Sequence, residues 1–150
     1  PRSAGGTAYL LLGAVGAGVD IASGLTLGAV SGNDRVTMHP DTLNEIDGNQ
    51  VPHWDKLLEI AALGYDVSEL GYLGVDMVID RDLGPLMLEM NARPGLNIQI
   101  ANGAGLKPRF AAIDQHLSSN PFDADPASRA AVSRELIQRL VAPASVSMMG

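Results

Sequence analysis

The sequence predicts an α+β domain in which helices pack on one face of an antiparallel sheet. Three observations predict this class: short apolar segments typical of strands, longer segments with a 3.6-residue helical period, and strands that are grouped rather than alternating singly with helices. The chain has 150 residues, of which 46% are hydrophobic and 18% charged. This length and composition are sufficient for one globular domain with its own core.

Glycine-rich, β-like sequence opens the chain. We expect a strand near Gly16–Ile21, a turn at Ala22-Ser23-Gly24 and a second strand near Leu25–Val30. The glycines from Gly13 to Gly18 are similar to a dinucleotide-binding fingerprint, but that motif requires a helix directly after the glycines. Here Val19-Asp20-Ile21 continues a strand, so bulges or a close approach of another backbone explain the glycines better.

Polar residues over 31–51 predict a long surface loop, which is unusual in a compact domain and therefore a candidate for function. A helix is expected from about Trp54 to Leu70, with Pro52 before it and Gly71 as its stop. His53 would cap this helix or pack beside it. The helical period is carried by Leu57, Leu58, Ala61, Ala62 and Tyr65.

Two strands follow, at about Tyr72–Asp80 and Leu86–Asn91, and an apolar, amide-rich segment comes after Pro94-Gly95. In that segment Asn97, Gln99 and Asn102 could line a substrate site or bond to the loop's own backbone. The last elements predicted are helices near Pro108–His116 and Pro126–Val141 and a loose tail over 142–150.

The two strands after residue 72 predict a hairpin with two opposed carboxylates. If Ile79 pairs with Leu86, Asp76 lies directly opposite Glu89. Alternation then makes one face wholly apolar, with Leu73, Val75, Met77, Ile79, Leu86, Leu88 and Met90. The other face carries Asp76, Val78, Met87, Glu89 and Asn91.

Carboxylates opposed at this distance repel each other by roughly 3–4 kcal/mol at an effective dielectric constant near 20. A shared proton or a bound cation would offset the repulsion. Two carboxylates and an amide oxygen, without His or Cys, are hard ligands suited to Mg²⁺ or Mn²⁺, and Mg²⁺ commonly binds them together with substrate phosphates. The alternative is a solvated acidic face with no ligand, and the hairpin alone leaves both interpretations open.

The sequence resembles the ATP-grasp superfamily at these residues. A strand Asp in VDMVID is followed by Glu-x-Asn and then Pro-Gly in LEMNARPG, so that type, order and spacing all agree. The most similar branch is the α-L-glutamate ligase-like one. The glycine-rich GAVGAGVDIASG, the HPDT loop and the VPHWDKLLEIA helix occur in the same order as in that branch, so the chain resembles its C-terminal lobe.

The resemblance implies an ATP-dependent ligase that joins a small-molecule or peptide carboxylate to an amine through an acyl phosphate, using two Mg²⁺ ions. Asp76 would hold one ion, Glu89 would bridge both, and Asn91 would hold the second. A hydrophobic residue, Leu88 or equally Val78, would contact the adenine. Arg93 would bind a phosphate or the substrate carboxylate as a catalytic residue, or it is a surface arginine.

Two departures from the family pattern limit what the resemblance implies. No first lobe with phosphate-binding lysines precedes Pro1, and Lys56 and Lys107 do not replace it. Tyr9-Leu10-Leu11 stands where related ligases carry Asn-x-His. We therefore expect the chain to be part of a longer two-lobe enzyme and incomplete in catalysis, with Arg2 and Ser3 as remnants of a substrate-binding segment. The alternative is a non-catalytic nucleotide-binding or assembly module.

The composition of the chain limits which binding partners and which cellular compartment we expect for the protein. A formal charge of −7 argues against binding to bare nucleic acid, and no window is apolar enough to predict a membrane span. The absence of Cys excludes disulfides and thiolate metal sites and suits a cytoplasmic protein. A lobe without its partner would expose apolar surface, so a homo-oligomer is also expected.

Overall fold

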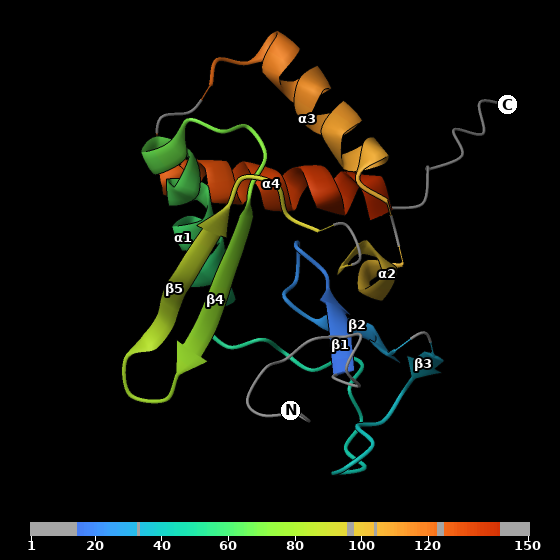
Figure 1. Ribbon diagram of the computed structural model, residues 1–150. Coiled ribbons are helices and arrows are strands. Elements are labelled where there is room, and N and C mark those ends of the chain that lie inside the picture. The colour runs from blue at the N-terminus through green and yellow to red at the C-terminus, as the bar shows by residue number, and fades with distance from the viewer. Residues whose placement is uncertain (1–14, 33, 96–97, 104, 123–124, 142–150) are drawn as a thin grey trace, which may run out of the picture.

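The computed structural model describes residues 15–141, apart from 33, 96–97, 104 and 123–124 (Figure 1). The predictions for residues 2–3, 9–11, 13 and 97 and for the tail over 142–150 therefore lie outside the described residues. The α+β class is confirmed: helices accompany two antiparallel sheets. The sequence predicted one sheet, but within the described residues the strands form a three-stranded sheet and a separate two-stranded ribbon.

The three-stranded sheet consists of β1 (Val15–Val19), β2 (Thr26–Ser31) and β3 (Asp34–Val36), in that order. Gly16 and Gly18 lie within β1 and are not followed by a helix, which agrees with the rejection of the dinucleotide fingerprint. The strand β3 occupies part of the segment predicted as loop. After it the chain still runs as an irregular excursion, held by single bridges between Met38 and Glu45 and between Leu25 and Gln50.

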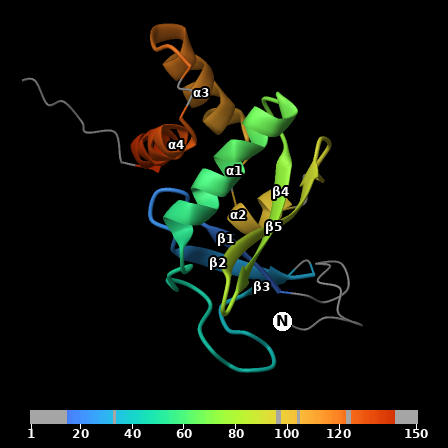
Figure 2. The same cartoon turned by 90° about the vertical axis from the view of Figure 1, so that its left-hand side faces the viewer.

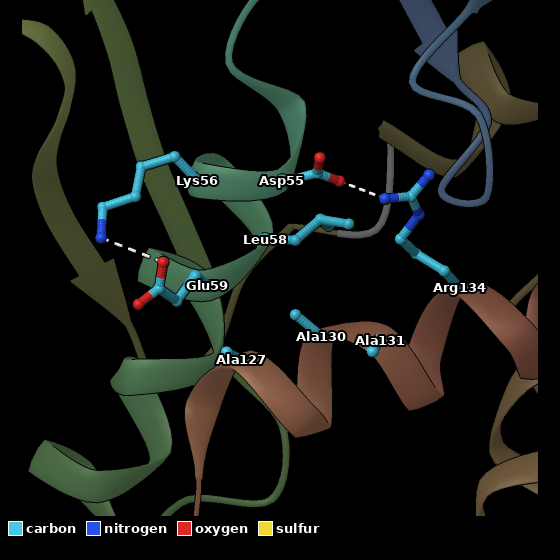
Figure 3. Close-up of a pocket in the computed structure, with 8 residues that line it drawn as sticks. All are labelled: Asp55, Lys56, Leu58, Glu59, Ala127, Ala130, Ala131 and Arg134. Carbon is cyan, nitrogen blue, oxygen red and sulfur yellow. Dashed lines mark hydrogen bonds and ion pairs between the residues drawn. The ribbon is translucent and has the colours of Figure 1, made fainter.

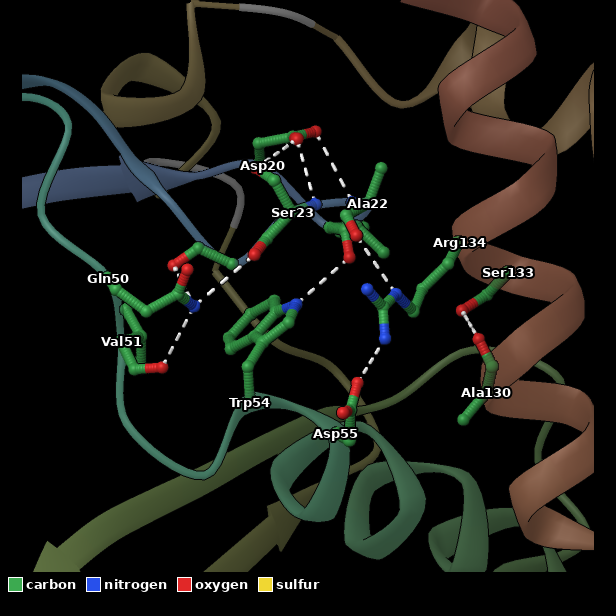
Figure 4. Close-up of polar contacts among 12 residues, drawn as sticks. Asp20, Ala22, Ser23, Gln50, Val51, Trp54, Asp55, Ala130, Ser133 and Arg134 are labelled. Atoms are coloured by element: carbon green, nitrogen blue, oxygen red, sulfur yellow. Dashed lines mark hydrogen bonds and ion pairs between the residues drawn. The ribbon is translucent and has the colours of Figure 1, made fainter.

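The turn between β1 and β2 is held by side chains from two helices (Figure 4). The indole Nε1 of Trp54 donates a 2.9 Å hydrogen bond to the carbonyl oxygen of Ile21, and Nε of Arg134 donates one of 2.9 Å to that of Ala22. The turn closes at Gly24, whose φ of +76° favours glycine and whose missing Cβ would lie 2.6 Å from the Trp54 ring. These contacts join the turn to both long helices.

The helix α1 (Trp54–Ser68) begins where the sequence predicted and ends slightly earlier. Glu69, in the left-handed conformation, ends it by donating its N–H to the carbonyl of Tyr65 at 2.7 Å, so Gly71 is not the stop. His53 occupies the N-cap position but makes no side-chain capping hydrogen bond.

The ribbon consists of β4 (Gly74–Asp80) and β5 (Gly84–Asn91), and α1 lies along one face of it (Figure 2). The helix α1 approaches the ribbon closely at Gly64. A Cβ there would lie 3.3 Å from Leu73 Cδ1 and 3.4 Å from Met90 Sδ. The face of the ribbon that carries Leu73 and Met90 is therefore the covered face.

Three further helices follow in the described residues: α2 (Ile98–Asn102), α3 (Lys107–Ser119) and α4 (Pro126–Val141). The short α2 was not predicted, whereas α3 and α4 agree closely with the sequence analysis. The helix α2 packs on β1 and β2, and α4 packs on both α1 and α3. The most buried apolar residues among those described come from β2 and from α1, α2 and α4: Ala29, Val30, Leu57, Ala101, Ala130 and Ile137.

Candidate functional site

The structure places three of the predicted metal ligands on one face of the β4–β5 ribbon. Asp76 lies directly opposite Glu89, as predicted, and Gly74 lies opposite Asn91. Val75 and Met90 form the pair between them, and Met90 contacts α1. Because successive side chains point to opposite faces, Asp76, Glu89 and Asn91 share the face that α1 does not cover.

A β-bulge changes the register immediately beyond the carboxylates. Met77 pairs with Met87, Val78 with Leu86 and Ile79 with Pro85, so Leu88 is the extra residue. The predicted pairing of Ile79 with Leu86 is therefore wrong. Leu86 belongs to the carboxylate face and Met87 to the opposite one, which reverses both of their predicted positions.

The bulge adds an apolar surface beside the carboxylates. Val78 and Leu86 share their face, and Leu88 is 64% exposed at the bulge itself. Bulges commonly lie next to active sites, where they redirect a side chain. The flat hairpin predicted from the sequence had put Leu88 on the covered face, and the bulge removes the basis for that assignment.

Oxygen ligands for a hard cation are present and open. Asp76 and Glu89 are exposed, and within the described part of the chain neither side chain makes an ion pair or hydrogen bond. Asn91 Oδ1 accepts the backbone N–H of Arg93 at 3.0 Å, which leaves that oxygen a second lone pair. The donor set therefore fits Mg²⁺ or Mn²⁺. No cluster of three or more His, Cys, Asp or Glu side chains suited to a metal occurs in the described residues, so the set consists of two carboxylates and an amide.

Two of the three residues proposed to line the acceptor site, Gln99 and Asn102, fall on α2. Gln99 Oε1 is enclosed and has no hydrogen-bond partner among the described residues, and Asn102 Oδ1 lies against Gly18 of β1, 3.0 Å from where a Cβ would be. Their assignment to the acceptor site remains a prediction.

Neither lysine belongs to a strand of the ribbon. Lys56 Nζ, on α1, pairs with Glu59 at 3.0 Å, and Lys107 begins α3. A cavity of about 430 Å³ between α1 and α4 has this pair at one end and the Arg134–Asp55 ion pair at the other, above an apolar floor (Figure 3). Because its charged groups neutralise each other, the cavity offers no free charge to an anionic ligand.

Comparison with known proteins identifies the family. A model described as sugar-transfer associated ATP-grasp matches residues 1–115. The chain belongs to this ATP-grasp family. No curated protein and no solved structure gives a significant match.

The ATP-grasp match includes the β4–β5 ribbon and α2 and ends within α3, so α4 lies beyond it. It confirms the superfamily predicted from the Asp, Glu-x-Asn and Pro-Gly pattern, whereas the glutamate ligase-like branch remains a prediction. In the described part of this ATP-grasp chain, no helix is both long and apolar enough to cross a membrane.

Proposed function

We propose that this chain carries the metal- and nucleotide-binding half of an ATP-dependent carboxylate–amine ligase. The observation that supports the proposal most directly is the register of the ribbon, which puts Asp76 opposite Glu89 and Asn91 on the same uncovered face. Such a face brings three oxygen ligands together without using His or Cys.

Each residue has a role that follows from its position. Asp76, Glu89 and Asn91 would hold two Mg²⁺ ions, with Glu89 between them, and Val78, Leu86 and Leu88 would form an apolar support for the adenine. Bound Mg²⁺ neutralises phosphate charge and aligns the phosphates with the acceptor carboxylate. Arg93 follows the ribbon directly, and its guanidinium would bind a phosphate or the carboxylate.

The substrates belong to the class that the reaction requires, a carboxylic acid and an amine. Because the family is described as sugar-transfer associated, acids and amines carried on sugars belong in the test set together with glutamate. A cytoplasmic location and a homo-oligomer are parts of the same proposal.

The first test is Mn²⁺ binding, measured by electron paramagnetic resonance with and without ATP. We expect Glu89→Gln and Asp76→Asn to raise the Kd at least tenfold. Asp82→Asn is the matched control, since Asp82 is exposed at the tip of the same ribbon and its carboxylate pairs with Arg81. Equal affinity in all four proteins would refute the metal site.

The second test separates a ligase from a binding module. We expect the 150-residue chain to bind Mn²⁺ and ATP but to form no ADP with glutamate or sugar acids, because neither of its two lysines belongs to the ribbon and Lys56 is already paired with Glu59. ADP formation that depends on an added acid would show that this chain is a complete ligase. Binding of ATP that persists in Glu89→Gln would instead favour a non-catalytic nucleotide-binding module.

A further inference from the structure

Gly74, the first residue of β4, has a neighbour too close for any side chain. A Cβ built on Gly74 would lie 2.8 Å from Pro94 Cβ, 3.5 Å from Pro94 Cγ and 3.8 Å from Asn91 Cβ. The first distance is well inside van der Waals contact. The pyrrolidine ring cannot swing aside as a flexible side chain would, so a larger residue at position 74 must displace the backbone around Pro94.

That backbone connects the ribbon to the segment after it and holds two residues of the proposed site. Asn91 is the ladder partner of Gly74, and only Ala92 and Arg93 separate it from Pro94. The turn is closed by the hydrogen bond from the N–H of Arg93 to Oδ1 of Asn91. A displaced Pro94 would therefore change both the orientation of the Asn91 amide and the position of Arg93.

We infer that Gly74 is a positioning residue for the metal site. Its hydrogen atom in place of a side chain lets Pro94 sit against β4, and this contact orients the oxygen of Asn91 on the face that carries Asp76. The inference rests on the proposed function, because it assigns Gly74 an effect on ligands of that site.

The requirement is specific to this glycine. Gly71 and Gly95 lie close to the two ends of the same contact, and apart from their own chain neighbours no described residue has an atom within 4 Å of the position of a Cβ there. Neither has a positive φ. Alanine should therefore fit at both positions without moving Pro94.

The experiment compares Gly74→Ala with Gly71→Ala in the full 150-residue chain. We expect Gly74→Ala to raise the Mn²⁺ Kd at least tenfold at a temperature well below unfolding and to accelerate hydrogen exchange of the Arg93 amide. Gly71→Ala should match the wild type in both. Leu57→Ala, which removes a buried side chain of α1, should lower the Tm without changing the Kd. Wild-type affinity and Arg93 protection in Gly74→Ala would overturn the inference.

A second variant covers the case in which Gly74→Ala does not fold. Pro94→Gly removes the opposing Cβ, so adding Gly74→Ala to it should cause little further change in Arg93 exchange or in Mn²⁺ affinity. An equal loss in both backgrounds would contradict the contact. If the wild type binds no Mn²⁺, the proposed function fails, but Arg93 exchange still tests whether Gly74 sets the turn.

Discussion

Arg129 of α4 pairs with Asp66 of α1 at 2.7 Å, across 63 positions of the sequence. The same guanidinium donates to the carbonyl of Ala62 at 3.0 Å. It lies 5.8 Å from the ring centre of Tyr65 and 5.3 Å from that of Phe122, and its side chain is 12% exposed. One side chain thus joins two helices and the segment that precedes α4.

We expect Arg129→Ala to lower the free energy of unfolding by about 2–3 kcal/mol, because it removes charge-assisted hydrogen bonds from a largely buried site. Urea denaturation followed by circular dichroism measures the loss. Arg139→Ala is the control, since Arg139 is exposed and its ion pair with Glu135 lies within α4. This substitution should cost at most about 0.5 kcal/mol. Equal losses would show that the position of Arg129 confers no special stability.

Trp54→Phe tests the attachment of the β1–β2 turn to α1. The variant keeps most of the ring but leaves the carbonyl of Ile21 without its indole donor, so we expect a loss of about 1–3 kcal/mol in urea denaturation. Tyr72→Phe keeps the edge-on ring contact with Phe110 at 5.6 Å and should be nearly neutral. A neutral Trp54→Phe would mean that the bond adds nothing to stability.

Leu43→Gly should stabilise the protein. Leu43 has a φ of +55° and is 72% exposed, so it has backbone strain without much burial to offset it. Left-handed backbone costs a non-glycine residue about 1–2 kcal/mol, and the greater freedom of glycine in the unfolded chain cancels about 0.5–1 kcal/mol. We therefore expect a gain of up to about 1 kcal/mol in thermal denaturation. Leu83→Gly, at a site 74% exposed without positive φ, should instead lower stability.

The tip of the ribbon should loosen in acid. The backbone N–H groups of Leu83 and Asp82 donate to Asp80 and hold the pKa of that carboxyl below its ordinary value of 3.8. Because the folded pKa is the lower one, the stabilisation is complete above pH 3.8 and is lost as the pH falls through the folded pKa. Hydrogen exchange of the Leu83 amide should therefore report weaker protection below this pH. Asp80→Asn should remove the pH dependence, and its persistence would contradict the assignment.

The sequence was sufficient to predict the helices and strands that have a strong periodic pattern of apolar residues. The stripe around Leu57 predicted α1, and Pro126 helped to predict the start of α4, where the Asp125 carboxylate accepts the N–H of Ser128. The five-residue α2 has too few residues to show a period, and the three residues of β3 lie in a polar segment. Both elements depend on packing against their neighbours.

The arrangement of the candidate site residues was predicted in part. The opposition of Asp76 and Glu89 was predicted from a pairing of Ile79 with Leu86 that is wrong, and it is present in the structure because the bulge at Leu88 shifts the register by one residue. The bulge at Leu88 left no pattern in the sequence, since an extra residue in an apolar run leaves the run apolar. The contact of Pro94 with Gly74 was also missed, because two residues 20 positions apart show their proximity only once the ribbon has folded.

The packing of α4 against α1 has a practical consequence for anyone who truncates the gene to residues 1–115, the region that the family model matches. Cutting after residue 115 would discard Arg129, Arg134 and the buried Ala130 and Ile137. The remaining polypeptide would keep the ribbon, but the apolar face of α1 that packs against α4 would be exposed to water. The truncated protein should aggregate on expression. A failure of that protein to bind Mn²⁺ or ATP would therefore give no information about the ribbon.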